Sequence, residues 1–184
     1  VDAAHCQGVC VIAKSKPDKI PKLRPAFKKD GTVTAANASS INDGAGALVV
    51  MAAEKAKELG IKPLAKIVDF CSGAQAPEWF TTAPIKATKK LLKKADIKTE
   101  DVDIWEVNEA FAVVNLAFEK ELGVSRDVIN VHGGAVVLGH PIGATGARLL
   151  TTLLYAMKRY DKKLGLTTMC IGGGEAASVL VELY

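Results

Sequence analysis

The sequence predicts a layered α/β fold in which a mixed five-stranded sheet carries helices on both faces. Three observations support this prediction. Runs with strand character alternate with runs of helical periodicity, which is typical of α/β layers. Aromatic residues make up only 5% of the chain while glycine and alanine are abundant, which suits helices packed tightly on a sheet. The 184 residues, 49% of them hydrophobic, are enough for one sizeable domain with its own core.

Local signals place the individual elements. We predict strands at 47–51, 64–70, 102–107, 165–171 and 177–183. We predict helices at 53–59, 84–95, 109–122 and 143–159. Gly60 and Gly123 end two of these helices, and Pro84 begins another. The proline-containing stretch 17–43 and the glycine-rich stretch 130–142 are predicted loops.

Charge and composition exclude some classes of protein. The 24 basic and 20 acidic side chains give a net charge of +4, which is too small an excess to indicate nucleic-acid binding. No apolar run approaches the ~20 residues that a membrane-spanning helix needs. The lysines of helix 84–95 lie opposite its apolar positions and are predicted to form a solvated face. They are Lys86, Lys89, Lys90, Lys93 and Lys94.

The four cysteines form no C-x-x-C pair and the three histidines no helical ligand pair, so the sequence indicates no metal site. No secretion signal is visible, and we therefore expect reduced thiols in an intracellular protein. This protein would be cytoplasmic, or would lie in the mitochondrial matrix if its source is eukaryotic. The first residue is Val1 rather than Met, from which we expect a fragment or a processed product.

Asn108 stands at the junction of a predicted strand and a predicted helix, in the stretch Asn108-Glu109-Ala110-Phe111-Ala112. One interpretation is an N-cap, because an Asn side-chain oxygen can accept from first-turn amides. The other is that Asn108 projects from the end of the sheet into a cleft, where the sites of α/β proteins usually form. The motif alone leaves both interpretations open.

His140 lies among glycines in the stretch 133–148, within the predicted loop 130–142 and just before a predicted helix. A single histidine is often structural, but small neighbours permit close approach of a substrate, and imidazole can exchange protons near neutral pH. Cys170 precedes three glycines, Gly172 to Gly174, at the end of a predicted strand. It is either a buried free thiol or a thiolate base beside amides that can hold an oxyanion.

Together and in this order, the three motifs resemble those of the thiolase family. The stretch 130–148 is similar to the family's histidine loop, 108–112 to its N-E-A-F motif, and 170–174 to its C-x-G-G-G turn. The stretch 30–43 resembles the region that leads from the CoA-binding loop into the C-terminal domain. The likeness is greatest to the acetoacetyl-CoA thiolases.

The resemblance covers 17–184 and implies a division of the chain. Residues 1–41 would be a remnant of the CoA-binding loop region, with 1–16 unassigned, and 42–184 would be the C-terminal domain. The implied fold is the layered thiolase fold, in which two such halves pack together and subunits form homodimers or homotetramers.

The resemblance also implies roles for four residues. His140 would activate a nucleophilic cysteine that takes the acyl group from one acyl-CoA. Cys170 would remove the α-proton of a second acetyl-CoA, and its pKa would have to be lowered by neighbouring amides and His140. Asn108 would hold a water beside the enolate oxygen, and the amide of Gly172 would hold the tetrahedral oxyanion.

Further residues are implied to bind the substrate. Ser39 would hydrogen-bond the pantetheine arm of CoA, and Phe80 would line the acyl pocket and favour short chains. The CoA channel would be lined by Phe27, Ala35, Ile41, Ala110 and Phe111. The implied reaction joins two acetyl-CoA into acetoacetyl-CoA and CoA, or reverses this by thiolysis, with CoA thioesters as substrates and no metal or prosthetic group.

The sequence departs from the family in several places. The nucleophilic cysteine belongs to the family's N-terminal half and has no match here, since Cys6 and Cys10 lie in an unlike context. The chain alone would therefore be inactive. His132 stands where the family usually has asparagine, and Glu175 replaces a smaller residue. A non-catalytic acyl-CoA-binding or lipid-binding module is the main alternative, and a ketoacyl synthase is a further one, although a cysteine before three glycines is untypical of it.

Overall fold

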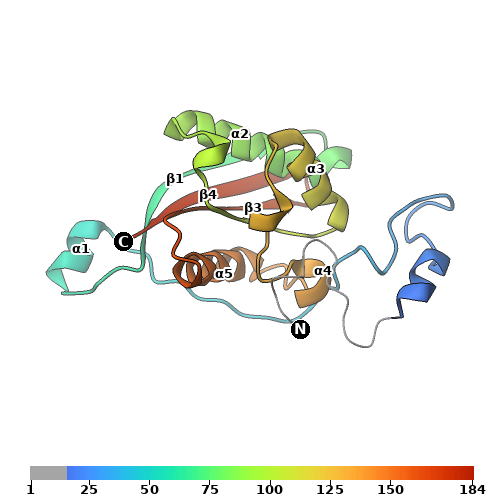
Figure 1. Cartoon of the computed structure of the whole chain (residues 1–184), viewed down its shortest axis with the longest axis horizontal. Coiled ribbons are helices and arrows are strands. Elements are labelled where there is room, and N and C mark those ends of the chain that lie inside the picture. The colour runs from blue at the N-terminus through green and yellow to red at the C-terminus, as the bar shows by residue number, and fades with distance from the viewer. Residues whose placement is uncertain (1–15) are drawn as a thin grey trace.

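The structure, a computed structural model, describes residues 16–184 (Figure 1). His5, Cys6 and Cys10, which entered the sequence analysis, lie outside these residues. The α-helices are α1 Ala53–Glu58, α2 Ala83–Ala95, α3 Ala112–Leu122, α4 Ala135–Leu138 and α5 Thr145–Arg159. The strands are β1 Ala65–Ala74, β2 Ile104–Val107, β3 Leu164–Ile171 and β4 Glu175–Leu183. Short 3-10 helices span Pro17–Lys22 (η2), Pro77–Thr82 (η3), Thr99–Asp101 (η4) and Arg126–Val128 (η5).

The strands form one mixed sheet in the order β1-β4-β3-β2. β4 pairs antiparallel with both β1 and β3, whereas β2 pairs parallel with β3. Helices α2 and α3 lie on one side of this sheet and α5 on the other (Figure 1). The predicted layered α/β fold is therefore confirmed. In the described part of the chain no helix is long and apolar enough to cross a membrane.

The prediction of five strands is wrong, because residues 47–51 form no strand. This run follows Gly46 in an extended course but pairs with no other strand in the described region. Its side chains are consequently exposed, with Val49 at 88% and Val50 at 66% of full exposure. An apolar, β-branched sequence indicates that a segment tends to be buried. A strand also needs a neighbouring strand that pairs with its amides and carbonyls.

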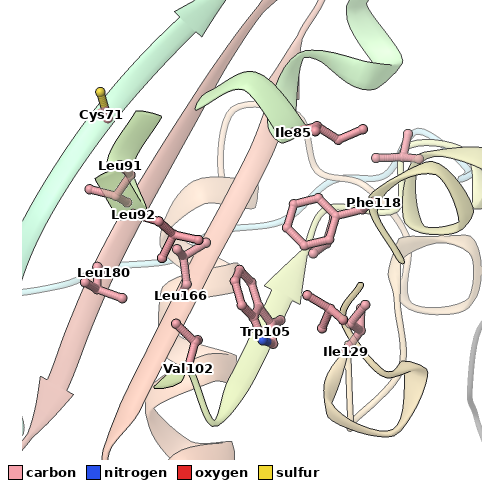
Figure 2. Packing of buried hydrophobic residues seen from close by; sticks show 13 residues of the cluster. Cys71, Ile85, Leu91, Leu92, Val102, Trp105, Phe118, Ile129, Leu166 and Leu180 are labelled. Atoms are coloured by element: carbon pink, nitrogen blue, oxygen red, sulfur yellow. The ribbon is translucent and has the colours of Figure 1, made fainter. Parts of the chain in front are cut away.

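The main core lies between the sheet and the helices α2 and α3 (Figure 2). Trp105 of β2 and Phe118 of α3 meet edge to face at its centre, with ring centroids 5.5 Å apart. Both are almost fully buried, and Leu91, Leu166 and other aliphatic side chains surround them. A second cluster, formed by residues such as Leu153 and Met157, fills the space between α5 and the opposite face of the sheet. The sheet is thus buried on both faces around β2 and β3.

Asn130 ties the loop after α3 to the open edge of β2. Its side-chain Oδ1 accepts from the Val107 amide and its Nδ2 donates to the Val107 carbonyl, both over 2.8 Å. Its own amide donates to the Trp105 carbonyl over 2.8 Å. Asn130 therefore pairs with the backbone groups on the open edge of β2 as a neighbouring strand would. Its backbone has a positive φ of 49°, which Asn tolerates better than most residues.

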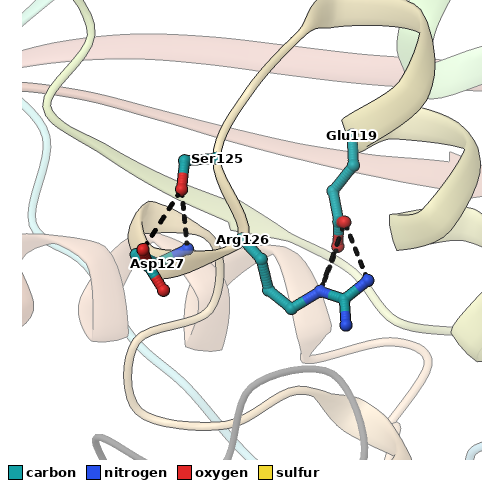
Figure 3. A network of polar contacts seen from close by, with 4 residues as sticks. All are labelled: Glu119, Ser125, Arg126 and Asp127. Atoms are coloured by element: carbon teal, nitrogen blue, oxygen red, sulfur yellow. Dashed lines mark hydrogen bonds and ion pairs between the residues drawn. The ribbon is translucent and has the colours of Figure 1, made fainter.

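The approach to Asn130 is held at the surface by a small polar network (Figure 3). Arg126 donates to both carboxylate oxygens of Glu119 on α3, over 2.9 to 3.2 Å, and Ser125 accepts from the amide of Asp127 over 3.3 Å. An exposed pair of this kind contributes only about 0–1 kcal/mol. Its effect is to fix the direction of the loop rather than to add much stability.

Three lysines of α2 do more than face the solvent. All are exposed, as predicted, but their ammonium groups donate to alternate carbonyls on the open edge of β1. Lys86 bonds Ala74 O over 2.6 Å, Lys90 bonds Ser72 O over 3.2 Å, and Lys94 bonds Phe70 O over 3.4 Å. One helical turn matches two strand residues, so the pattern repeats. These lysines occupy acceptors that a second strand would otherwise use.

If the lysines protect this edge, removing two of them should promote self-association. We expect Lys86→Ala/Lys90→Ala to sediment as larger species at concentrations where the unchanged chain does not. The matched control is Lys89→Ala/Lys93→Ala, which removes the same charge from the same helix but no bond to β1. Equal sedimentation of the two variants would show that net charge, and not edge protection, controls association.

Loss of the Asn130 side chain should destabilise the fold. Asn130→Gly keeps the positive φ accessible but leaves the buried amide and carbonyl of Val107 unpaired. We expect the free energy of unfolding to fall by roughly 2–6 kcal/mol, since each of the two buried unsatisfied groups costs about 1–3 kcal/mol. Urea unfolding measures this change. A loss confined to Asn130→Ala, with Asn130→Gly unaffected, would assign the role to backbone conformation instead.

Candidate active site

The three motifs meet at the end of the sheet where β2 and β3 terminate side by side. Asn108 directly follows β2, and its amide donates to the Thr168 carbonyl of β3 over 2.9 Å. Its side chain is fully buried. The N-cap interpretation of Asn108 is wrong, because α3 begins at Ala112 and has Phe111 at its N-cap position. Asn108 instead faces His140.

His140 makes a polar contact through each ring nitrogen. Its Nε2 lies 3.3 Å from Asn108 Nδ2, and its Nδ1 lies 2.7 Å from Thr145 Oγ1. Burial of the ring lowers the pKa of His140, and the positive charge of Arg148 lowers it further. The imidazole is therefore neutral near pH 7 and can accept a proton.

A buried charge pair, which the sequence analysis did not identify, supports this corner of the site. Arg148 Nη1 of α5 lies 3.7 Å from the Oε2 of Glu106, a fully buried residue of β2. Burial raises the pKa of Glu106, and Arg148 opposes that rise. The signal available in the sequence was a glutamate inside a predicted strand, two positions before Asn108 and so on the same face of β2.

Glu109 also lies beneath the site rather than in it. Its carboxylate is 2% exposed and accepts from the Val136 amide, at the start of α4, over 3.0 Å. Burial raises the pKa of Glu109 to about 7, although the bond from Val136 acts against the rise. Glu109 therefore connects the N-E-A-F stretch to the glycine-rich loop that carries His140.

Segment 37–41, called the strap below, contacts both the N-E-A-F stretch and the loop that carries His140. The amide and hydroxyl of Ser39 donate to the Ala110 carbonyl over 3.0 and 2.9 Å. Ala38 forms an isolated bridge with Phe111, and Ile41 forms one with His140. The structure thus brings together Ser39, Ile41, Ala110 and Phe111, four of the residues predicted to bind substrate.

An aromatic group extends from this strap. The ring of Phe111 meets Phe27 and Phe80 edge to face, with centroids 5.9 and 6.2 Å apart. Phe27 is 73% exposed, so its ring leaves one side open to a ligand. Ala35 lies exposed in the turn at residues 34–37 and shares none of these contacts.

Cys170 is the penultimate residue of β3 and is 7% exposed. Within residues 16–184, no hydrogen bond joins its Sγ to His140 or Asn108. Burial raises the pKa of the Cys170 thiol, so the expected lowering by neighbouring groups is not found in this chain. The structure joins His140 to Asn108 directly, whereas Cys170 shares only the same end of the sheet.

Gly172 lies in the turn that links β3 to β4. The turn is closed by the Gly174 amide, which donates to the Ile171 carbonyl over 3.1 Å. Gly174 has a φ of +99°, and a Cβ there would collide with the Gln75 carbonyl, so the position requires glycine. The exposed amide of Gly172 meets no acceptor among the described residues and can donate to a ligand.

Comparisons with known proteins agree with this geometry. The family described as thiolase, C-terminal domain, matches residues 61–183, and thiolase, N-terminal domain, matches residues 10–54. The chain belongs to the thiolase family. It is 51% identical over 171 residues to an acetyl-CoA acetyltransferase of Syntrophomonas wolfei, which covers 92% of this chain and 43% of that protein. The chain thus spans less than half the length of this curated relative.

Two solved structures show the same fold. The acetyl-CoA acetyltransferase of Bacillus anthracis superposes with a TM-score of 0.91 at 45% identity, over 94% of this chain and 44% of that one. A thiolase from Ascaris suum, solved in complex with coenzyme A, gives a TM-score of 0.84 at 42% identity, over 93% of this chain and 45% of that one. The fold and sequence of this chain are therefore those of a partial thiolase.

The buried carboxyl of Glu109 should make stability depend on pH. Its pKa is raised on folding, so the stability it contributes is full below about pH 4.5 and is lost as pH rises towards 7. We expect Glu109→Gln to reduce the loss of unfolding free energy between pH 5 and pH 8 by an amount on the order of 2–3 kcal/mol. Glu106, whose pKa is also raised, leaves a residual slope of the same sign. Parallel pH profiles of variant and unchanged chain, from urea unfolding, would contradict this assignment.

Proposed function

We propose that this chain is the C-terminal part of an acetyl-CoA C-acetyltransferase. Two acetyl-CoA give acetoacetyl-CoA and free CoA in one direction, and thiolysis is the reverse. The observation that carries the proposal is the contact of Asn108 with His140, held by the segment that bears Ser39, at the sheet end where Cys170 lies. The similarity to acetyl-CoA acetyltransferases supports the same reaction.

The first half-reaction needs a nucleophilic cysteine from an N-terminal thiolase half. His140, neutral at pH 7, accepts the thiol proton of that cysteine through Nε2. The thiolate attacks the thioester carbon of acetyl-CoA, and the tetrahedral oxygen receives a hydrogen bond from the Gly172 amide. The C–S bond to CoA then breaks, and CoA takes up a proton and leaves as a free thiol.

In the second half-reaction Cys170 exchanges a proton with the α-carbon of another acetyl-CoA. Removal of that proton gives an enolate, which attacks the acyl-enzyme and releases its cysteine. In thiolysis Cys170 returns the proton to the departing carbon, a role that suits a thiol whose pKa is raised. His140 and a water bound to Asn108 stabilise the enolate oxygen. Side chains, amides and CoA thioesters thus account for the proposed chemistry without a metal or prosthetic group.

Ser39 and the aromatic group around Phe111 form the proposed CoA side of the site. Ser39 donates its hydroxyl proton to Ala110, so its oxygen is free to accept from an amide of the pantetheine arm. The exposed ring of Phe27 offers an apolar wall to the same arm. This lining is continued by Ile41, Ala110 and, further away, Ala35. Phe80, beside Phe111, fills the acyl side and favours short chains.

An N-terminal thiolase half is the proposed partner within the subunit. The exposed apolar run at 47–51 supports this, because it falls in the part of the chain that the N-terminal domain description matches. Covering Val49 and Val50 would remove apolar surface from water. We further propose a homodimer or homotetramer of the completed subunit, located in the cytoplasm or, in a eukaryote, in the mitochondrial matrix.

The 184-residue chain alone should show no steady thiolysis of acetoacetyl-CoA, whereas the chain combined with a family N-terminal half should. In that pair we expect Asn108→Ala to lower kcat about 10²–10³-fold, the usual loss for one oxyanion donor. His140→Asn and Cys170→Ser should each remove turnover while CoA binding, measured by calorimetry, persists. Acetoacetyl-CoA should be cleaved faster than 3-ketooctanoyl-CoA.

Three outcomes would contradict this proposal or a part of it. Steady turnover by the chain alone would mean that the nucleophile is present in it. CoA binding by the combined halves without any turnover would favour the non-catalytic binding module. Thiolysis of the longer substrate at an equal rate would remove the role given to Phe80.

A further inference from the structure

The direction of the hydrogen bonds around Thr145 is fixed by chemistry. Thr145 is the first residue of α5 and is fully buried. Its Oγ1 lies 2.9 Å from the Pro141 carbonyl oxygen and 2.7 Å from His140 Nδ1. A carbonyl oxygen can only accept, so the single hydroxyl proton is committed to Pro141. Towards the ring, Thr145 can therefore act only as an acceptor.

This acceptor determines which nitrogen of neutral His140 carries the proton. Nδ1 must hold the hydrogen that is donated to Thr145, and Nε2 is left with its lone pair. The lone pair faces the Nδ2 amine of Asn108, which is a donor. The two contacts therefore agree on the same tautomer, although they come from different elements of the fold.

The backbone holds the ring where this choice takes effect. The His140 amide donates to the Ser40 carbonyl over 2.9 Å and lies 3.3 Å from Asn42 Oδ1. Gly139, at a φ of +88°, has no room for a Cβ, which would collide with Asn42. The imidazole is thus strapped at its backbone and bonded at both nitrogens, which leaves it little freedom to rotate.

We propose that Thr145 is a positioning residue that holds His140 in the Nδ1–H tautomer and so reserves Nε2 for proton transfer. The tautomer follows from the geometry alone, whereas its use in proton transfer rests on the proposed function. The hydroxyl thus does for this histidine what a carboxylate or carbonyl partner does elsewhere, which is to orient the ring and to fix its protonated nitrogen.

The charged groups around the ring act on its pKa but do not choose its tautomer. Arg148, one turn further along α5, bears on the imidazole, and Glu106 of β2 pairs with that arginine. Asn108, which follows β2, and Asn42, which follows segment 37–41, are uncharged. When the Thr145 acceptor is removed, neutral and protonated His140 each lose one hydrogen bond. The imidazolium loses more stabilisation than the neutral ring does, so the pKa of His140 should fall further.

A purely structural role for Thr145 is the competing explanation, since a threonine hydroxyl often bonds a carbonyl four residues earlier. Two variants separate the roles. Thr145→Val keeps the branched shape and removes the hydroxyl, whereas Thr145→Ser keeps the hydroxyl. His132 serves as an internal reference, because its ring lies beside Tyr160, whereas the hydroxyl of Thr145 bonds His140 and Pro141.

The experiment is a long-range proton–nitrogen NMR spectrum of the labelled 184-residue chain between pH 5 and pH 9, with His140 assigned by loss of its signals in His140→Gln. We expect a protonated Nδ1 and an unprotonated Nε2 for His140 at high pH. In Thr145→Val the share of the Nδ1–H form should fall and Nε2–H signals should appear, because only the contact with Asn108 still favours Nδ1–H. In Thr145→Ser the tautomer should stay unchanged, as should the His132 signals in both variants. An Nε2–H tautomer of His140 in the unchanged chain would overturn the proposal. So would a tautomer population in Thr145→Val that is the same as in the unchanged chain.

The same variants separate this inference from the reaction. Combined with an N-terminal half, Thr145→Val should lower kcat about 10²-fold or more at unchanged KM, and Thr145→Ser should restore it. The NMR result needs no turnover. Absence of thiolysis when the unchanged chain is combined with an N-terminal half would therefore contradict the proposed function but not the tautomer. Full kcat in Thr145→Val despite the altered tautomer would overturn the link to proton transfer.

Discussion

The site depends on one constraint, which is that β2 is fully buried yet paired with a strand on only one side. All four of its residues are buried, and among the described strands only β3 pairs with it. Polar groups on its open side cannot reach water, so each must find a partner within the chain. The segment from 129 to 148, which includes α4 and the start of α5, provides those partners and is thereby positioned over the end of the sheet.

The partners along β2 follow one another in order. Arg148 pairs with Glu106, Asn130 satisfies the backbone of Val107, and His140 contacts Asn108. Beyond the strand, Glu109 accepts from the amide of Val136. The contacts that stabilise a buried edge therefore also align the imidazole. This explains why a loop rich in glycine, which costs conformational entropy, can still present a histidine in one orientation.

Much of the fold could be read from the sequence, because hydrophobic periodicity and glycine or proline punctuation report local structure. The helices that end at Gly123 or begin near Pro84 lie close to where they were predicted. Periodicity failed at 47–51, since it reports a tendency to be buried and carries no information about a pairing strand. The cap interpretation of Asn108 stayed open in the sequence, because a capping Asn and a site Asn occupy the same strand-to-helix junction.

The parts of the site that the sequence did not reveal are contacts between distant segments. Thr145 and Arg148 read as ordinary positions of a helix until the fold sets them against His140 and Glu106. The bond between Ser39 and Ala110 joins residues 71 positions apart, which no local pattern encodes. Motif likeness located the chemistry-bearing residues, whereas their protonation depends on burial that only the folded chain supplies.

Burial acts in opposite directions on the two titratable groups at this end of the sheet. It lowers the pKa of His140, because imidazolium is the charged form, and it raises the pKa of Cys170, because thiolate is the charged form. Both groups are thereby neutral near pH 7, one as a proton acceptor and the other as a proton donor. The proposed function uses both groups in this way, with His140 accepting a proton and the Cys170 thiol giving one. Burial thus keeps both groups uncharged at this end of the sheet, and the positive charge of Arg148 reinforces the effect on His140.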